Sequence, residues 1–176
     1  MLFRSVDLLR TAVGELDVFE AATLGDVSRL HALLANDPGL AKTYSSDGFT
    51  SLQLAAFFGQ PGSVEALLQY APDVNAVSRN PMKVAVINAA AASRNLEVVK
   101  FVLQAGANPD AQQHAGYAAL HEAAANNNVE LAKALLNAGA DPGVRTDAGV
   151  TAADMAREKG HTEIAELLEA RKPPAG

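Results

Sequence analysis

The stretch ALHEAAANNN, residues 119–128, contains a helix and the signal that ends it. Alanine, leucine and glutamate are among the best helix formers, so residues 119–125 are predicted to be helical. Asn126, Asn127 and Asn128 follow, and asparagine favours turns, caps and left-handed backbone. A second helical pattern, VELAKALLNAGADP, begins directly afterwards at Val129. The stretch therefore predicts two short helices joined by a tight turn.

The same arrangement recurs along the chain at steps of 34, 35, 33 and 33 residues. Each copy has a pair of small or helix-forming residues, and two residues then separate this pair from a glycine or its substitute. The pairs are Ala21-Ala22, Ala55-Ala56, Ala90-Ala91, Ala123-Ala124 and Ala156-Arg157. The positions that follow are Gly25, Gly59, Arg94, Asn127 and Gly160. Five copies in register predict a repeat protein, in which each unit packs on its neighbours.

Composition restricts the classes of function. Hydrophobic residues make up 49% of the 176-residue chain but aromatic residues only 5%, which suits closely packed short helices. There is no cysteine, so disulfides and zinc–thiolate sites are excluded. The net charge of −6 disfavours nucleic acid and anionic membranes as partners. No apolar run approaches the roughly 18 residues of a spanning helix, and charged residues interrupt the N-terminus, so we expect a soluble, cytoplasmic protein.

The repeated unit resembles the ankyrin repeat, whose first helix opens on a Thr-Pro-Leu-His-like motif. The matching stretches are Thr50-Ser51-Leu52-Gln53, Ala118-Ala119-Leu120-His121 and Thr151-Ala152-Ala153-Asp154. The resemblance covers residues 16–170. It implies an all-α, ankyrin-type α-solenoid of about five helix–turn–helix repeats. A β-turn or hairpin segment, here called the finger, projects between one repeat and the next.

We place the repeats at about 16–46, 47–79, 80–112, 113–145 and 146–172, with a tail at 173–176. Ahead of them, Leu2, Val6, Leu9, Val13 and Leu16 recur at helical spacing, which predicts an amphipathic helix over residues 1–15. A solenoid needs its exposed end covered, so we interpret this helix as an N-terminal cap. A docking helix for a partner is the alternative.

The third repeat departs most from the pattern. Arg94 stands at the glycine position of its inter-helix turn, and we expect strain or a different turn there. Ala71 and Lys83 also replace expected glycines, and the finger VSRNPMK is two residues longer than the later fingers. We therefore expect faster amide exchange at residues 76–84 than in the fingers near 113–117 and 146–150.

The signals for catalysis are weak. HEAAA begins like the His-Glu-x-x-His zinc motif, but Ala125 stands where the second histidine is needed. The resemblance implies instead that His121 holds the neighbouring finger by hydrogen bonding. Phosphate-binding glycine loops, nucleophile elbows and clustered metal ligands are also missing from the sequence. We predict a non-catalytic protein without metal or cofactor.

In the ankyrin family, the residues that face partners flank the finger turn or follow the Ala pair. The resemblance thus implies a partner-binding concave face made of fingers and first helices. We assign to it Asp47, Phe49, Phe57, Phe58, Met82, Lys83, His114, Tyr117, Asn126, Asp147 and Glu158. Four of the nine Phe and Tyr residues fall in this set, and aromatic residues are enriched at interface cores. The alternative for Phe57 and Phe58 is a structural contact with the preceding finger, while Ala92 and Ala125 predict a shallow groove.

Three functions fit these patterns. The first is a protein–protein interaction module, such as an adaptor, inhibitor or regulator, that holds another protein on the concave face as a monomer. The second is a small-molecule-binding or enzymatic protein that uses a groove near His114, Glu122 and Met155. The third is a structural subunit of a larger assembly, docked through the N-terminal helix. The absence of a convergent polar set favours the first.

Overall fold

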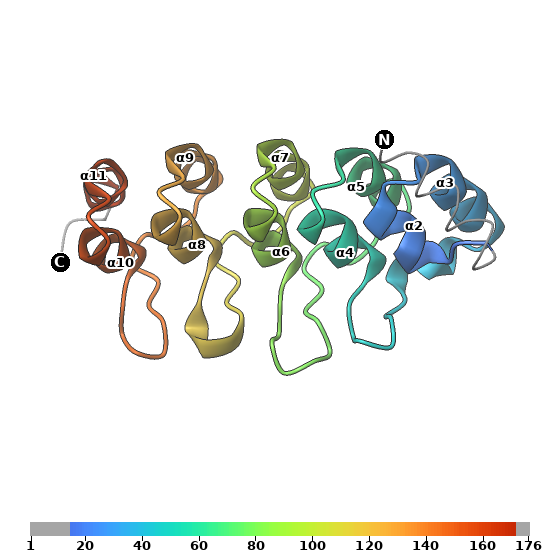
Figure 1. Cartoon of the computed structure of the whole chain (residues 1–176), viewed down its shortest axis with the longest axis horizontal. Coiled ribbons are helices and arrows are strands. Elements are labelled where there is room, and N and C mark those ends of the chain that lie inside the picture. The colour runs from blue at the N-terminus through green and yellow to red at the C-terminus, as the bar shows by residue number, and fades with distance from the viewer. Residues whose placement is uncertain (1–14, 172–176) are drawn as a thin grey trace, which may run out of the picture.

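The computed structural model describes residues 15–171, and this part of the chain folds into ten α-helices and two short 3-10 turns (Figure 1). The helices form consecutive pairs. The pairs are α2 (Val18–Leu24) with α3 (Val27–Asn36), α4 (Ser51–Phe57) with α5 (Pro61–Leu68), α6 (Val86–Ala92) with α7 (Leu96–Gln104), α8 (Ala119–Ala125) with α9 (Val129–Asn137), and α10 (Ala152–Glu158) with α11 (Thr162–Ala170). The 3-10 turns are η1 (Pro38–Lys42) and η2 (His114–Gly116). The predicted N-terminal helix and tail lie outside the described residues, apart from Glu15.

The pairs stack side by side into two rows of helices. In the first-helix row, α4 packs between α2 and α6, and α8 packs between α6 and α10. In the second-helix row, α5 packs between α3 and α7, and α9 packs between α7 and α11. The fingers project side by side from the first-helix row, along one edge of the solenoid (Figure 1). The predicted all-α solenoid of helix–turn–helix units with projecting fingers is confirmed.

Small side chains let the rows pack closely. The pairs Ala55-Ala56 and Ala123-Ala124 are completely buried between neighbouring repeats. Larger apolar residues fill the space behind them, and among these Leu67, Val99 and Leu135 are at most 1% exposed. The core is therefore a continuous thin layer along the solenoid. Within residues 15–171, no helix is both long and apolar enough to cross a bilayer.

The inter-helix turns follow the glycine rule even where glycine is replaced. Asn127 has φ 51° and Arg94 has φ 58°, in the same left-handed region as Gly59 at φ 67°. The prediction of a left-handed residue at Asn127 is confirmed. Arg94 adopts this conformation too rather than a different turn, at a cost of about 1–2 kcal/mol for an L-residue. Its guanidinium donates a hydrogen bond to Asn126 Oδ1 at 2.9 Å.

The third, fourth and fifth fingers are each held by the finger before them through a backbone hydrogen bond. Arg79 N–H donates to Gly48 O at 2.8 Å, and His114 N–H donates to Met82 O at 2.9 Å. Asp147 N–H donates to the carbonyl of Ala115 at 3.0 Å. The fingers thus form a bonded array, so each one is positioned by its neighbours as well as by its own helices.

A polar side chain of each central first helix secures the following finger. Gln53 Nε2 donates to Val84 O at 2.6 Å, and Asn88 Nδ2 donates to Ala111 O at 3.1 Å. His121 Nε2 lies 3.1 Å from Val150 O, and its Nδ1 accepts from the N–H of Ala118. His121 is 1% exposed, and this burial lowers its pKa because a buried imidazolium loses hydration. The finger-holding role implied for His121 is confirmed.

The third finger is longer by two residues. Its β-bridge joins Val77 to Ala85, whereas the bridges of the second and fifth fingers join Tyr44 to Thr50 and Arg145 to Thr151. It is nevertheless well bonded. Ser78 Oγ accepts from the N–H of Val84 and donates to Asn80 Oδ1, which also accepts from the N–H of Met82. These bonds stabilise the extra residues, and the faster amide exchange expected in this finger stays a prediction.

Candidate functional site

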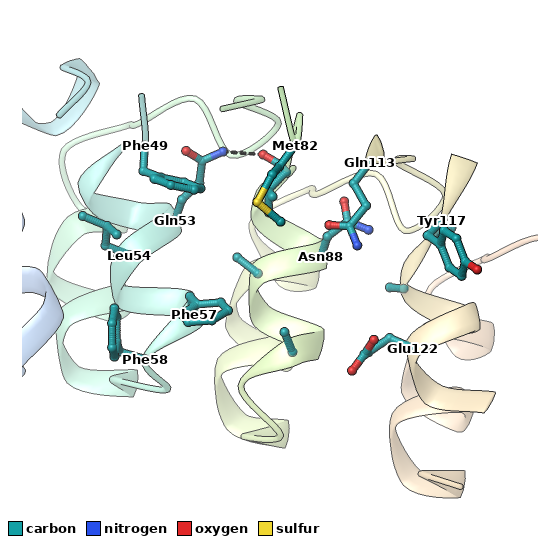
Figure 2. A pocket seen from close by; sticks show the side chains of 15 residues that line it. Phe49, Gln53, Leu54, Phe57, Phe58, Met82, Asn88, Gln113, Tyr117 and Glu122 are labelled. Atoms are coloured by element: carbon teal, nitrogen blue, oxygen red, sulfur yellow. Dashed lines mark hydrogen bonds between the residues drawn. The ribbon is translucent and has the colours of Figure 1, made fainter. Parts of the chain in front are cut away.

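A groove of about 420 Å³ crosses the first-helix row between α4 and α8, with α6 as its floor (Figure 2). One wall comes from α4 and its finger, and includes Phe49 and Phe57. The opposite wall comes from α8 and its finger, and includes Tyr117 and Glu122. Met82, at the tip of the third finger, closes the finger end of the groove. Three successive repeats therefore build one site.

The groove exists because equivalent positions carry residues of different size. Directly before the Ala pair, α4 has Leu54, α6 has Ala89 and α8 has Glu122. Directly after the pair, α4 has Phe57 and α6 has Ala92. The methyl groups of α6 thus lie between the long side chains of α4 and α8, as Figure 2 shows. The hollow is the volume that larger side chains on α6 would have filled.

The groove gathers exposed apolar side chains. Phe57 is 53% exposed, Phe58 52%, Met82 59% and Tyr117 40%, and all four line the groove. Among residues 15–171, only Leu24 and Val77 are other large hydrophobic side chains classed as exposed. The Phe57 and Phe58 rings meet edge to face with centroids 5.3 Å apart. Because Phe57 and Phe58 are each about half exposed, contact with the finger accounts for only part of their surface, and clustered exposed apolar residues usually mark interaction sites.

Most polar groups in the groove already serve the fold. The side-chain amides of Gln53 and Asn88 donate hydrogen bonds to carbonyl groups of the following fingers. Glu122 is different, because its carboxylate extends from α8 towards α6 (Figure 2). Its Oε1 accepts a 2.6 Å hydrogen bond from Asn126 Nδ2, and Asn126 Oδ1 accepts in turn from Arg94 Nη2. The strained Arg94 and the turn asparagine therefore orient a carboxylate at the edge of an apolar groove.

A second hollow of about 880 Å³ lies between α2 and α4. Phe49, Leu54 and Phe58 line both hollows, so they form a ridge between them. The second hollow is more acidic, with Asp17 at the N-cap of α2, Glu20 on α2 and Asp47 on the finger. Asp17 and Glu20 cap α2: the Asp17 carboxylate accepts from the N–H groups of Phe19 and Glu20, and the Glu20 carboxylate accepts from the N–H of Asp17.

The structure distributes the sequence-predicted site residues unevenly. Five of them line the groove: Phe49, Phe57, Phe58, Met82 and Tyr117. Asp47 lines the second hollow. The other five, Lys83, His114, Asn126, Asp147 and Glu158, are exposed but line neither hollow.

Sequence reasoning missed part of the groove. Leu54 and Ala89 line the groove, and each lies directly before the Ala pair of its helix. Each is therefore three residues before the position that follows the pair, which is Phe57 on α4 and Ala92 on α6. That helical spacing is the signal that could have identified them. Ala92 lines the groove as expected, but Ala125 does not.

The small-molecule or catalytic alternative named a groove near His114, Glu122 and Met155. Glu122 lines the groove between α4 and α8, but His114 and Met155 do not. Over residues 15–171, no group of three or more His, Cys, Asp or Glu side chains could hold a metal ion. The groove between α4 and α8 therefore contains only one of the three residues named for that alternative.

Helical hairpins stacked in two rows, with fingers along one edge, define the class of α-solenoid repeat proteins. Within this class the chain belongs to the ankyrin repeat family, because the family model for ankyrin repeats (3 copies) matches residues 18–112 and 86–173. Ankyrin repeats are generally non-catalytic protein–protein interaction modules.

Two curated proteins are similar over part of their length. A probable E3 ubiquitin-protein ligase XBOS31 of Oryza sativa subsp. japonica is 42% identical over 95 residues, which are 53% of this chain and 21% of that protein. The ankyrin repeat and SAM domain-containing protein 6 of Rattus norvegicus is 31% identical over 103 residues, 58% of this chain and 12% of that protein. The chain thus spans a small part of each relative.

Proposed function

We propose that this chain is a non-catalytic interaction module that binds a segment of another protein in the groove between α4 and α8. The observation that carries the proposal is the gathering of Phe57, Phe58, Met82 and Tyr117, each at least 40% exposed, around one hollow. Aromatic residues and methionine are enriched at interface cores, and buried aromatic anchors supply most of the energy at a typical interface.

The small floor of the groove supports this function. Ala89 and Ala92 let a partner side chain descend between the walls, so that it is covered on two sides by Phe57 and Tyr117. Such enclosure removes more apolar surface from water than contact with a flat face. The polar side chains Gln53 and Asn88 are engaged with finger carbonyls, which favours binding over chemistry here.

The test compares Phe57→Ala and Tyr117→Ala with Val77→Ala. Val77 is a matched control, because it is 43% exposed and does not line the groove. Proteins captured from extract by the unaltered chain would be identified, and the affinity of a purified captured partner would be measured for each variant. Each groove variant should lose about 1–3 kcal/mol of binding, while Val77→Ala should bind normally.

The proposal fails if both groove variants bind the purified partner as well as the unaltered chain does. Thermal melts of all three variants show whether a loss of binding reflects unfolding. If a groove variant unfolds, Phe57→Leu keeps an apolar side chain while removing the ring, and its affinity decides the question.

A further inference from the structure

Glu122 brings the one carboxylate in the lining of the groove between α4 and α8. It occupies the position filled by Leu54 on α4 and Ala89 on α6, where neighbouring repeats are apolar. Its side chain is partly buried, and the Asn126 amide holds one oxygen in place at 2.6 Å. The carboxylate is therefore a directed feature of the groove.

The charge of Glu122 is left uncompensated within residues 15–171. No Lys, Arg or His nitrogen lies within 4 Å of its carboxylate in this part of the chain, and no bond to its Oε2 is present. Arg94 reaches Asn126 Oδ1 rather than Glu122. Lys83 is exposed on the third finger but does not line the groove.

A purely apolar partner would therefore bind poorly. Covering Glu122 would strip water from a carboxylate without replacing its hydration, and an uncompensated buried charge is strongly destabilising. A lysine or arginine in the partner would compensate this loss. Arginine fits best, since its planar guanidinium can donate to the Oε2 that Asn126 leaves open.

The wider charge distribution acts in the same direction. The adjoining hollow carries Asp17, Glu20 and Asp47, and the whole chain has a net charge of −6. A basic segment would be attracted to this end of the solenoid before it docks.

Resting on the proposed function, we propose that the groove recognises a linear protein segment in which apolar side chains, seated between Phe57 and Tyr117, adjoin a lysine or arginine that pairs with Glu122. The apolar part supplies affinity and the basic residue supplies selectivity, because segments without it leave the carboxylate desolvated. The strained Arg94 then contributes to recognition indirectly, because it holds Asn126, and Asn126 orients Glu122.

The experiment uses a phage-displayed library of random linear peptides as the probe, selected on the full chain. Binding of the enriched peptides is then measured on Glu122→Gln, Glu122→Lys, Phe57→Ala and Glu158→Lys. Glu158 is the matched control for charge reversal, since it is exposed and lies outside the groove. Melts of each variant establish that it is folded.

The enriched peptides should combine apolar residues with lysine or arginine. They should lose about tenfold or more in affinity for Glu122→Lys, less for Glu122→Gln, and under about threefold for Glu158→Lys. A separate selection on Glu122→Lys should enrich acidic residues at the corresponding peptide position.

Two failures are distinguishable. If peptides need Phe57 but lack an enriched basic residue, or bind Glu122→Lys unchanged, the partner chemistry is wrong and the groove still binds. An equal loss on Glu158→Lys also overturns the proposal, because it reveals general attraction to an acidic protein. If no peptide is enriched, or if binding ignores Phe57→Ala, the proposed function itself is contradicted.

Discussion

Stacking of the fingers can be measured by adding one methyl group at two glycines. Gly116 and Gly149 occupy the same place in the fourth and fifth fingers, with φ 76° and 79°. A Cβ at Gly116 would lie 2.7 Å from the backbone nitrogen of Asp147 and 3.0 Å from the carbonyl carbon of Thr146. A Cβ at Gly149 would meet no described atom within 4 Å. The two substitutions to alanine thus share a backbone penalty and differ in their contact with a neighbouring finger.

The shared penalty is about 1–2 kcal/mol, partly offset because alanine restricts the unfolded chain. Gly116→Ala must also push the fifth finger away, which breaks the 3.0 Å bond from Asp147 N–H to Ala115 O. A lost hydrogen bond and its local contacts add about 1–2 kcal/mol. We therefore expect Gly116→Ala to lower the free energy of unfolding by that much more than Gly149→Ala.

Urea unfolding followed by circular dichroism measures both variants, and a gap of 1 kcal/mol corresponds to about 2–4 °C in thermal midpoint for a chain of this size. Equal midpoints, with unchanged urea slopes, would show that the fingers are not in backbone contact and would refute the reasoning. Amide exchange at Asp147 gives an independent measurement, because only Gly116→Ala should speed it.

Three further predictions concern the core and the turns. His121→Gln should flatten the pH dependence of stability. Burial lowers the pKa of His121, so the unaltered chain loses stability as pH falls below the unfolded pKa of about 6.5. The urea midpoint should therefore fall between about pH 7.5 and 5.5 by more in the unaltered chain than in the variant, and an equal fall in both proteins would contradict the reasoning. Ala71→Gly should stabilise the protein by roughly 0.5–1 kcal/mol, because Ala71 has the left-handed φ of 47°. Ala32→Gly, on the exposed face of α3, should instead destabilise the protein by about 1 kcal/mol. Urea melts that change in the same direction for both variants would contradict the backbone argument. Leu135→Ala, at a fully buried site, should cost about 2–5 kcal/mol, and Tyr117→Ala, at a 40% exposed site, less than about 1 kcal/mol; the reverse order in thermal melts would misplace core and surface.

The turns and helices were readable from the sequence because each depends on a few neighbouring residues. The asparagines after α8 predicted a left-handed residue, and Asn127 adopts φ 51°. Arg94 shows the limit of local reasoning. Its side chain predicted either strain or another turn, and the strained alternative is the one observed, because α6 and α7 pack against neighbours on both sides and Arg94 adopts φ 58°. The longer third finger was also noticed in the sequence, but only the structure shows that Ser78 and Asn80 bond its extra residues.

The groove shows where sequence reasoning stops. Phe57, Met82 and Tyr117 were predicted for the concave face, and all three line the groove. His114, Asp147 and Glu158 followed from the same family positions but line neither the groove nor the second hollow. Exposure of a position is a property of one repeat, whereas membership of a groove depends on the side chains in the adjacent repeats.

The sequence by itself determined the period, the helix pairs, the left-handed turns and the ankyrin family, because these recur in every unit and rest on local backbone preference and neighbour packing. Only the tertiary structure decided where the solenoid is hollow. That depends on Ala89 and Ala92 standing between the larger Leu54 and Phe57 on one side and Glu122 on the other. Residues some 35 positions apart become neighbours through stacking, so the groove and its carboxylate exist only once the repeats are laid side by side.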